Sequence, residues 1–171
     1  MMNSITNDIL QGKIFIYPTD TIYGMGCNAL NEKAVERIRH IKGRDRDKPL
    51  SIIAPGLDWI KKHCMIDVNL KKYLPGPYTI ILKKKDPLFL RHVSDTDSLG
   101  IRIPKIDFSK KIEEAGVPFI TTSVNLSGQP FAKSIEEIPK EILNKVDRVI
   151  DTGELNGKPS TLIINGKEVS R

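Results

Sequence analysis

Apolar residues recur along this chain in two patterns, as short runs and as stretches with helical spacing. The runs are rich in Ile, Leu, Val, Phe, Tyr and Thr and are bounded by Gly, Pro or polar residues, which is typical of strands. They predict strands at 13–17, 50–54, 78–83, 98–104, 118–122 and 147–151, and a hairpin over 160–171. Asn165-Gly166, at the centre of that hairpin, suits a type I′ turn.

The stretches with helical spacing lie between these strands. Asn31 can cap a helix whose buried face is formed by Ala34, Ile38 and Ile41, and Gly43 can end it. Shorter helices are predicted at 57–62, 67–74 and 108–115. Strands that alternate with helices and end in an antiparallel hairpin predict an α/β (α+β) fold. We expect a single domain over 1–171, with a twisted mixed β-sheet and flanking helices.

The composition fits one ordinary domain and adds a hint about partners. At 171 residues the chain is long enough to bury a full core. Its net charge of +6 and pI near 9.3 point to an anionic partner such as a nucleotide or an RNA, although a lysine-rich solvated surface gives the same balance. The basic clusters are interpreted as such surface: Lys61-Lys62, Lys71-Lys72, Lys83 to Lys85 and Lys110-Lys111.

Several classes of site are excluded by what the sequence lacks. Cys27 and Cys64 are too few and too far apart for a disulfide framework or a zinc site, and we expect no metal held by protein ligands. The segment 153–161 fails the Walker A spacing, and the three histidines have no orienting motif. The N-terminus lacks a leader pattern and no apolar run approaches the ~20 residues of a membrane span, so we expect a cytoplasmic protein without membrane contact.

Three short polar segments next to apolar stretches carry candidate chemistry. Lys42-x-Arg44 supplies two cations, and Ser123-x-Asn125 supplies a hydroxyl and a carboxamide. The third segment, 18–26, is predicted to be a strand-to-helix loop and adds three hydroxyl groups, those of Thr19, Thr21 and Tyr23. Cations beside neutral polar groups can hold a polyphosphate and a small polar substrate together, so these segments indicate an ATP-consuming enzyme.

Each of these residues also has a plain structural interpretation. A cation at the C-terminal end of a helix, as predicted for Lys42, is favoured by ~0.3 to 1 kcal/mol through the macrodipole. Hydroxyl and carboxamide groups in turns often bind local backbone. Arg102 lies on the face of its predicted strand opposite Leu99 and Ile101. There it can line a site, or form a surface ion pair worth under ~1 kcal/mol.

Six segments stand in sequence along nearly the whole chain: PTDTIYGMGCNA, KGRDRDKPL, PGPYTIILK, SLGIRIP, PFITTSVNLSGQP and GKPSTLI. Their order and spacing resemble those of the YrdC-domain family, the threonylcarbamoyl-adenylate synthases. One such segment alone is a weak signal, but six in order are not expected by coincidence. The resemblance implies a twisted mixed sheet with helices and a positively charged concave face, in the short, single-domain form.

The resemblance also implies an activity. A nucleotidyltransferase of this family would condense L-threonine, bicarbonate and ATP to threonylcarbamoyl-AMP and pyrophosphate, for N6-threonylcarbamoyladenosine modification of tRNA. The carbamate formed from threonine and bicarbonate supplies the nucleophile, so the protein mainly aligns groups and spreads charge. Mg²⁺ would arrive on the phosphates. A tRNA threonylcarbamoyl-transferase partner and a contact with tRNA or other RNA are implied as well.

The family pattern assigns roles to residues of this chain. The catalytic set, which would hold the nucleotide and its phosphates, is Lys42, Arg44, Ser123 and Asn125. Substrate- and nucleotide-binding residues would be Thr19, Thr21, Tyr23, Arg102, Thr121 and Ser160, with the Arg102 guanidinium suited to the threonine carboxylate. Arg171 is a candidate for a late arginine of the family.

This chain departs from the family pattern at Asp45, where Pro is common, at Ile53, where a His is common, and at Phe131, where a Ser is common. Threonine specificity therefore stays open. Two other functions fit the sequence. One is an RNA-binding module without catalysis, which the basic balance favours, and the other is a related enzyme that adenylates a different carbamate, which the missing His favours.

Overall fold

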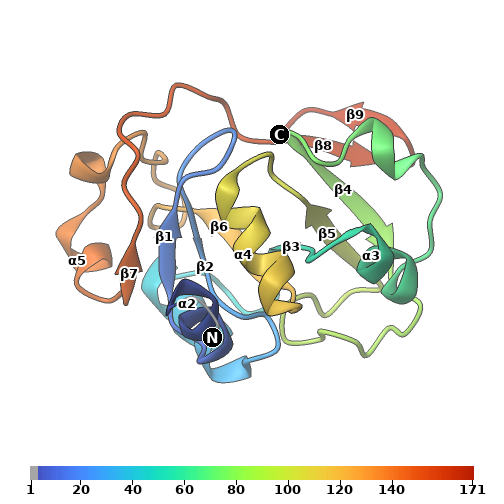
Figure 1. Cartoon of the computed structure of the whole chain (residues 1–171), viewed down its shortest axis with the longest axis horizontal. Coiled ribbons are helices and arrows are strands. Elements are labelled where there is room, and N and C mark those ends of the chain that lie inside the picture. Colours follow the sequence, from blue (N-terminus) through green and yellow to red (C-terminus); the bar gives the residue numbers. More distant parts are fainter. Residues whose placement is uncertain (1–3) are drawn as a thin grey trace.

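A computed structural model describes residues 4–171 and contains a mixed sheet of nine strands in the order β7-β1-β2-β6-β3-β5-β4-β8-β9 (Figure 1). The strands are β1 (Phe15–Tyr17), β2 (Gly24–Gly26), β3 (Ser51–Ile53), β4 (Tyr78–Lys83), β5 (Ser98–Arg102), β6 (Phe119–Ser123), β7 (Arg148–Val149), β8 (Thr161–Ile164) and β9 (Lys167–Val169). The helices are α1 (Ser4–Leu10), α2 (Glu32–Lys42), α3 (Leu57–His63), α4 (Asp107–Ala115) and α5 (Lys140–Leu143), with 3₁₀ turns η1 (Leu70–Lys72) and η2 (Ile135–Glu137). The expected mixed sheet with flanking helices is confirmed.

The two faces of the sheet bury different cores. The larger core contains Ile16, Ile52 and Ile101 from the strands and is covered by apolar residues of α2, α3 and α5. The smaller core lies on the opposite face under α1 and α4, and it is built from aromatic rings and aliphatic side chains: Ile9, Phe15, Tyr17, Ile53, Phe108, Ile112 and Phe119. Figure 1 shows α4 lying across the sheet. Since side chains alternate along a strand, polar residues that share a face with the smaller core can line a site beside it.

Helix α2 has the N-terminal cap, the buried apolar face and the terminal glycine that the sequence predicts. The Asn31 side chain accepts a hydrogen bond from the Ala34 amide, and Ala34, Ile38 and Ile41 are buried. Gly43 ends the helix in a left-handed conformation with φ of 61°, which glycine adopts without steric cost. Lys42 and Arg44 therefore stand at the point where the chain leaves the helix.

The interpretation of residues 18–26 as a strand-to-helix loop is wrong. Gly24–Gly26 forms β2, which pairs antiparallel with β1 and with β6, so Thr19 and Tyr23 lie in the loop of a hairpin. Glycine has a low β-propensity, so the sequence did not indicate this strand. Close packing requires glycine here, because a Cβ on Gly26 would lie 1.8 Å from the carbonyl oxygen of Ile120. The strict alternation of strands and helices is likewise broken, here and between β4 and β5.

Two smaller expectations also meet the structure. The hairpin of β8 and β9 is confirmed, with positive φ at both Asn165 and Gly166 as a type I′ turn requires. The interpretation of Lys84 as solvated surface is wrong, because it is only 2 % exposed. Its ammonium donates to the carbonyl oxygens of Pro87, Phe89 and Ser94 at 2.9 to 3.0 Å, so this cation organises the loop after β4. Among residues 4–171, no helix is long and apolar enough to cross a membrane.

Candidate active site

A polar cavity of about 250 Å³ opens on the face of the sheet that carries the smaller core. It is formed by the β1–β2 loop, the segment after α2, the middle of β6, the end of β5 and the start of β8. Of the residues predicted for the site, the lining contains Thr19, Thr21, Tyr23, Arg44, Arg102, Thr121, Ser123, Ser160 and Arg171. Segments far apart in sequence thus meet in one place, as the sequence predicts.

Lys42, Ser123 and Asn125 form one connected network behind this lining. The Lys42 ammonium donates to the Ser123 carbonyl oxygen at 2.5 Å, to the Asn125 carboxamide oxygen at 2.8 Å and to the Ser123 hydroxyl at 3.4 Å. The Ser123 hydroxyl donates to the same carboxamide oxygen at 2.7 Å. The predicted convergence of the two polar pairs is therefore confirmed, and the three donors of the ammonium all have protein acceptors.

Burial of Lys42 has an electrostatic consequence. Lys42 is 2 % exposed, and desolvation, followed by repulsion from the Arg44 guanidinium, lowers the pKa of its amine to about 7. A cation that is costly to keep charged is held here by three oxygen acceptors. Lys42 thus binds the loop that carries Ser123 and Asn125, and only Ser123 of the three faces the cavity.

Arg44 reaches the cavity from the loop after α2. Its Nη2 donates to the Pro49 carbonyl oxygen at 2.8 Å, and its backbone amide donates to the Arg39 carbonyl oxygen at 2.9 Å. Its Nε is buried and has no hydrogen-bond partner within residues 4–171. Arg44 as a residue lines the cavity, where its terminal guanidinium N–H groups can donate to an oxygen ligand.

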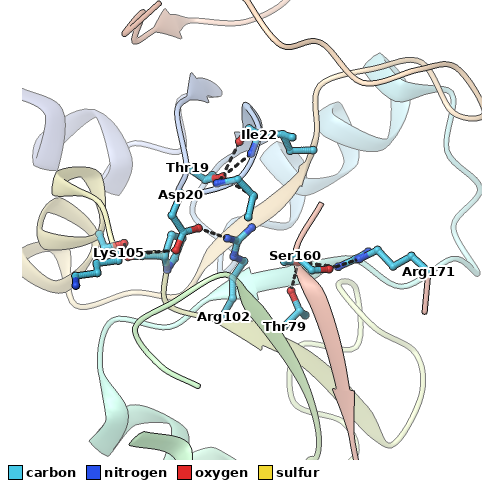
Figure 2. A network of polar contacts seen from close by, with 11 residues as sticks. Thr19, Asp20, Ile22, Thr79, Arg102, Lys105, Ser160 and Arg171 are labelled. Atoms are coloured by element: carbon cyan, nitrogen blue, oxygen red, sulfur yellow. Dashed lines mark hydrogen bonds and ion pairs between the residues drawn. The ribbon is translucent and has the colours of Figure 1, made fainter. Parts of the chain in front are cut away.

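Arg102 lies at the end of β5 and is 6 % exposed. Its Nη2 donates to one carboxylate oxygen of Asp20 at 2.6 Å, and the other oxygen accepts from the Lys105 amide at 2.9 Å (Figure 2). Desolvation lowers the pKa of Arg102, and the charge of Asp20 opposes that shift. The Arg102 Nε is the second buried cavity donor that lacks a partner in the described part of the chain.

Ser160, directly before β8, forms hydrogen bonds with two other residues of the cavity lining, Thr79 and Arg171. Its hydroxyl lies 2.7 Å from the Thr79 hydroxyl and accepts from the Arg171 guanidinium at 2.8 Å, as Figure 2 shows. The same guanidinium donates to the Ser160 carbonyl oxygen at 2.6 Å. Arg102 lies near enough to Arg171 to lower its pKa by repulsion, in addition to desolvation. A third guanidinium is thereby placed at the cavity.

The hydroxyl groups of the β1–β2 loop bind mainly to the protein. Thr19 Oγ1 donates to the Ile22 carbonyl oxygen at 2.6 Å, accepts from the amides of Thr21 and Ile22, and lies 2.9 Å from Thr21 Oγ1. The Tyr23 hydroxyl donates to the Gly153 carbonyl oxygen at 2.6 Å. These bonds shape the cavity wall, and Thr121 and Ser123 on β6 add further hydroxyls to the lining.

Sequence reasoning missed four polar residues that lie at this site. Ser51, Thr79 and Thr122 line the cavity, and Asp20 holds Arg102. Alternation along the strands is the signal that could have found Ser51, because it faces Thr121 in the β3–β6 register. Asp20 stands between two threonines in a turn, where an acidic residue is ordinary, and carried no signal of its own.

The departures from the family pattern fall in different places. Ile53 is fully buried in the smaller core with Phe15, Tyr17 and Phe119, so its side chain does not reach the cavity. Phe131, in contrast, is part of the lining. The missing His therefore alters a core position, and Phe131 is the departure that changes the surface of the cavity.

The arrangement is suited to a polyanion beside a small polar ligand. Arg44, Arg102 and Arg171 approach one cavity, and within residues 4–171 only Asp20 forms a close ion pair with one of them. Guanidinium groups bind phosphate and carboxylate oxygens with two parallel hydrogen bonds, and the surrounding hydroxyls can complete such a shell. Fold and site together define an α/β protein with an arginine-lined polar cavity on one sheet face.

Comparison with known proteins identifies the family. A family model of the Sua5/YciO/YrdC domain, described as telomere recombination, matches residues 7–170, and the chain belongs to this family. A putative threonylcarbamoyl-AMP synthase of Methanocaldococcus jannaschii is 44 % identical over 168 residues, 95 % of this chain and 79 % of that protein. The threonylcarbamoyl-AMP synthase of Pyrococcus abyssi is 34 % identical, over 91 % of this chain and 48 % of that protein. The chain is therefore an enzyme of the nucleotidyltransferase type that these relatives represent.

Solved structures agree with this assignment. Pyrococcus abyssi Sua5 complexed with L-threonine superposes with a TM-score of 0.82 at 32 % identity, over 93 % of this chain and 49 % of that one. Escherichia coli YciO superposes with a TM-score of 0.80 at 29 % identity, over 95 % of this chain and 82 % of that one. The chain thus spans about half the length of the Pyrococcus protein and most of the length of YciO.

Proposed function

We propose that this protein is an L-threonylcarbamoyladenylate synthase, which condenses L-threonine, bicarbonate and ATP to threonylcarbamoyl-AMP and pyrophosphate. The observation that carries the proposal is one cavity that three guanidinium groups and several hydroxyls line, in a chain related over most of its length to proteins of that name. The product would serve N6-threonylcarbamoyladenosine modification of tRNA, through a transferase partner that accepts the adenylate.

The reaction needs no nucleophile from the protein. The threonine amine and bicarbonate form a carbamate with loss of water, and a carbamate oxygen then forms a bond to the α-phosphorus. The bond from that phosphorus to the bridging oxygen of the β-phosphate breaks, and pyrophosphate leaves. Catalysis in such a reaction comes from alignment and from stabilisation of charge on the phosphoryl oxygens.

The residues of the cavity take the following roles in this proposal. Arg44 and Arg171 bind phosphate oxygens, to which their guanidinium N–H groups donate. Arg102, which Asp20 orients, binds the threonine carboxylate. Ser123 contacts the nucleotide while Lys42 and Asn125 fix its position, because the Lys42 ammonium already has three protein acceptors.

The remaining predicted residues complete the cavity in the same proposal. Thr121 and Ser160 offer hydroxyls to the adenylate, and Thr19, Thr21 and Tyr23 hold the wall against which the substrate lies. Mg²⁺ enters as part of the Mg·ATP substrate. Mg²⁺ usually keeps several of its waters and is bound through substrate phosphates, so it needs few protein ligands.

The test is pyrophosphate release from Mg·ATP, measured with and without bicarbonate across a panel of amino acids, with mass spectrometry of the adenylate. We expect release to require both threonine and bicarbonate. Release with another amino acid would favour an enzyme that adenylates a different carbamate. RNA binding that weakens steeply with salt, without any nucleotide turnover, would favour the RNA-binding module instead.

A further inference from the structure

Arg39, which sequence reasoning did not single out, is a buried cation in the last turn of α2. It is 4 % exposed, and its guanidinium donates to four backbone carbonyl oxygens. Nη1 reaches Asp45 at 3.1 Å and Lys48 at 2.7 Å, while Nη2 reaches His92 at 3.3 Å and Val93 at 3.0 Å. One side chain therefore joins two loops that are more than 40 residues apart in sequence.

The first of these loops carries a cavity residue at each end. It leaves α2 at Arg44 and returns to the sheet at Leu50, and both residues line the cavity. The side chains between them, from Asp45 to Pro49, are exposed and contribute no apolar anchor to either core. Loops held by few buried contacts open easily, so polar bonds must fix this one.

The bonds that fix the loop converge on Arg39. Its backbone carbonyl accepts from the Arg44 amide, and its guanidinium binds the loop at Asp45 and at Lys48. The Leu50 amide donates to the Val93 carbonyl at 3.0 Å, and that carbonyl also accepts from Arg39. The segment from 44 to 50 is thereby tied along its length to residues 92 and 93.

We propose that Arg39 is a positioning residue for the polyphosphate part of the site, which acts through the backbone of residues 44–50 and sets the position of the Arg44 guanidinium. This inference rests on the function proposed above for Arg44. Arg39 touches no substrate in this arrangement. A planar guanidinium is required because its two terminal nitrogens bind the two loops at once, which the single ammonium of a lysine cannot reproduce.

The charge of Arg39 supports the same role. The acceptors of its guanidinium are neutral carbonyl groups, and the charged groups that face it are Arg44, Glu36, Arg46 and Asp47. The positive charge of Arg39 is therefore not cancelled by a buried carboxylate. It adds to the positive potential behind the loop, which favours a polyphosphate on the other side.

Lys84 offers a matched control for this proposal. It is also a buried cation bound only to backbone carbonyls, and it holds the loop that follows β4. Its acceptors are outside the segment 44–50, at Pro87, Phe89 and Ser94, and none of these three residues lines the cavity. Lys84→Met should thus loosen the second loop, since Ser94 adjoins Val93, and destabilise the protein much as Arg39→Met does. Its effect on ATP should be smaller, because segment 44–50 keeps its bonds to Arg39.

The experiment compares Arg39→Met, Arg39→Lys and Lys84→Met. We expect Arg39→Met to lower kcat/KM for ATP about tenfold or more, because a displacement of about 1 Å can cost up to ~100-fold, while KM for threonine changes less than ~2-fold. Arg39→Lys should recover part of the loss, and guanidinium ion added to Arg39→Met should recover activity that equal ammonium does not. Lys84→Met should lower the melting temperature while it changes KM for ATP much less than Arg39→Met does.

A double-mutant cycle with Arg44→Ala tests the route. If Arg39 acts through Arg44, Arg39→Lys costs little once Arg44 is gone, so the two losses are not additive. Additive losses, or equal effects of Arg39→Lys and Lys84→Met on ATP, would overturn the proposal. Calorimetric ATP binding by the same variants separates it from the proposed function. If the wild-type protein binds ATP without turnover, the proposed synthase function is refuted. ATP binding by the variants would then still test the role of Arg39.

Discussion

The two halves of the cavity use their buried cations in different ways. In the Lys42 half, the ammonium has three protein acceptors and lies behind the lining. In the Arg102 half, one nitrogen is bound to Asp20 while Nε is buried without a partner in the described residues. Both cations looked alike in the sequence, as candidates for direct substrate contact.

This difference shows that the partners of a cation, and not its type, decide whether it is available to a ligand. Lys42 stabilises the loop of Ser123 and Asn125, so its effect on substrate is indirect. Arg102 lines the cavity, where its guanidinium can also donate to an incoming carboxylate or phosphate. The variants below should separate an indirect role from a direct one.

The largest effect is expected for Arg102→Met. Loss of a charged contact worth about 1.5 to 3 kcal/mol should lower kcat/KM for threonine ~10- to 150-fold. Arg102→Lys, which keeps the charge but loses the fork, should fall between wild type and Arg102→Met. Threonine titrations of all three proteins check this, and identical titrations would remove Arg102 from the threonine site.

A smaller loss, of about tenfold in kcat, is expected for Lys42→Met. The substitution removes the Lys42 donor from the Ser123 carbonyl and leaves the Asn125 carboxamide oxygen with the Ser123 hydroxyl, which costs about 1 to 3 kcal/mol and should also lower stability. Because the role is indirect, Lys42→Met and Asn125→Ala should not be additive. Additive losses in steady-state kinetics would instead point to separate contacts with the substrate.

Lys42 should also make folding stability depend on pH. Its pKa is about 7 in the folded protein, and the ordinary value of 10.5 applies once the chain unfolds, so the unfolded chain binds more protons between these limits. The free energy of unfolding should therefore rise with pH from 7 to 8.5, by at most ~1.4 kcal/mol per pH unit. Urea midpoints of wild type and Lys42→Met over this range check it. Equal slopes in the two proteins would show that Lys42 does not titrate there.

The smallest effect is expected for Asp20→Asn. The amide can still accept from Arg102 but cannot accept from the Lys105 amide with its nitrogen, and the ion pair is lost. A loss of about 1 kcal/mol should raise KM for threonine about fivefold. KM for ATP serves as the internal control, and an equal rise in both values would show a general disturbance of the cavity.

Much of the fold could be predicted because its signals are local. The cap at Asn31, the buried stripe of α2 and the Asn165-Gly166 turn each depend on neighbouring residues. Strand β2 could not be predicted in this way, since Gly24–Gly26 is a strand through its pairing with β1 and β6. Lys84 lies in a run of three lysines, and only the folded chain shows which of them is buried.

The sequence predicted which residues lie at the site better than it predicted the contacts that they make. The family resemblance selected Lys42, Arg102 and Ser160 from distant segments. In the structure Arg102 and Ser160 line one cavity, and Lys42 binds Ser123 of its lining. The resemblance could not reveal Asp20 or Arg39, because their importance depends on long-range hydrogen bonds to Arg102 and to two loops. The substrate roles of all these residues stay predictions.

The hairpin loop after β1 and the segment before β8 touch without any side chain between them. A Cβ on Gly157 would lie 2.2 Å from the carbonyl oxygen of Thr21, so only glycine lets the two stretches of backbone meet. Thr21 lines the cavity, so this close contact of the two backbones helps to fix one of its walls. A methyl group at Gly157 would force the two stretches of backbone apart while every polar group of the cavity kept its identity, which separates the shape of the cavity from its chemistry.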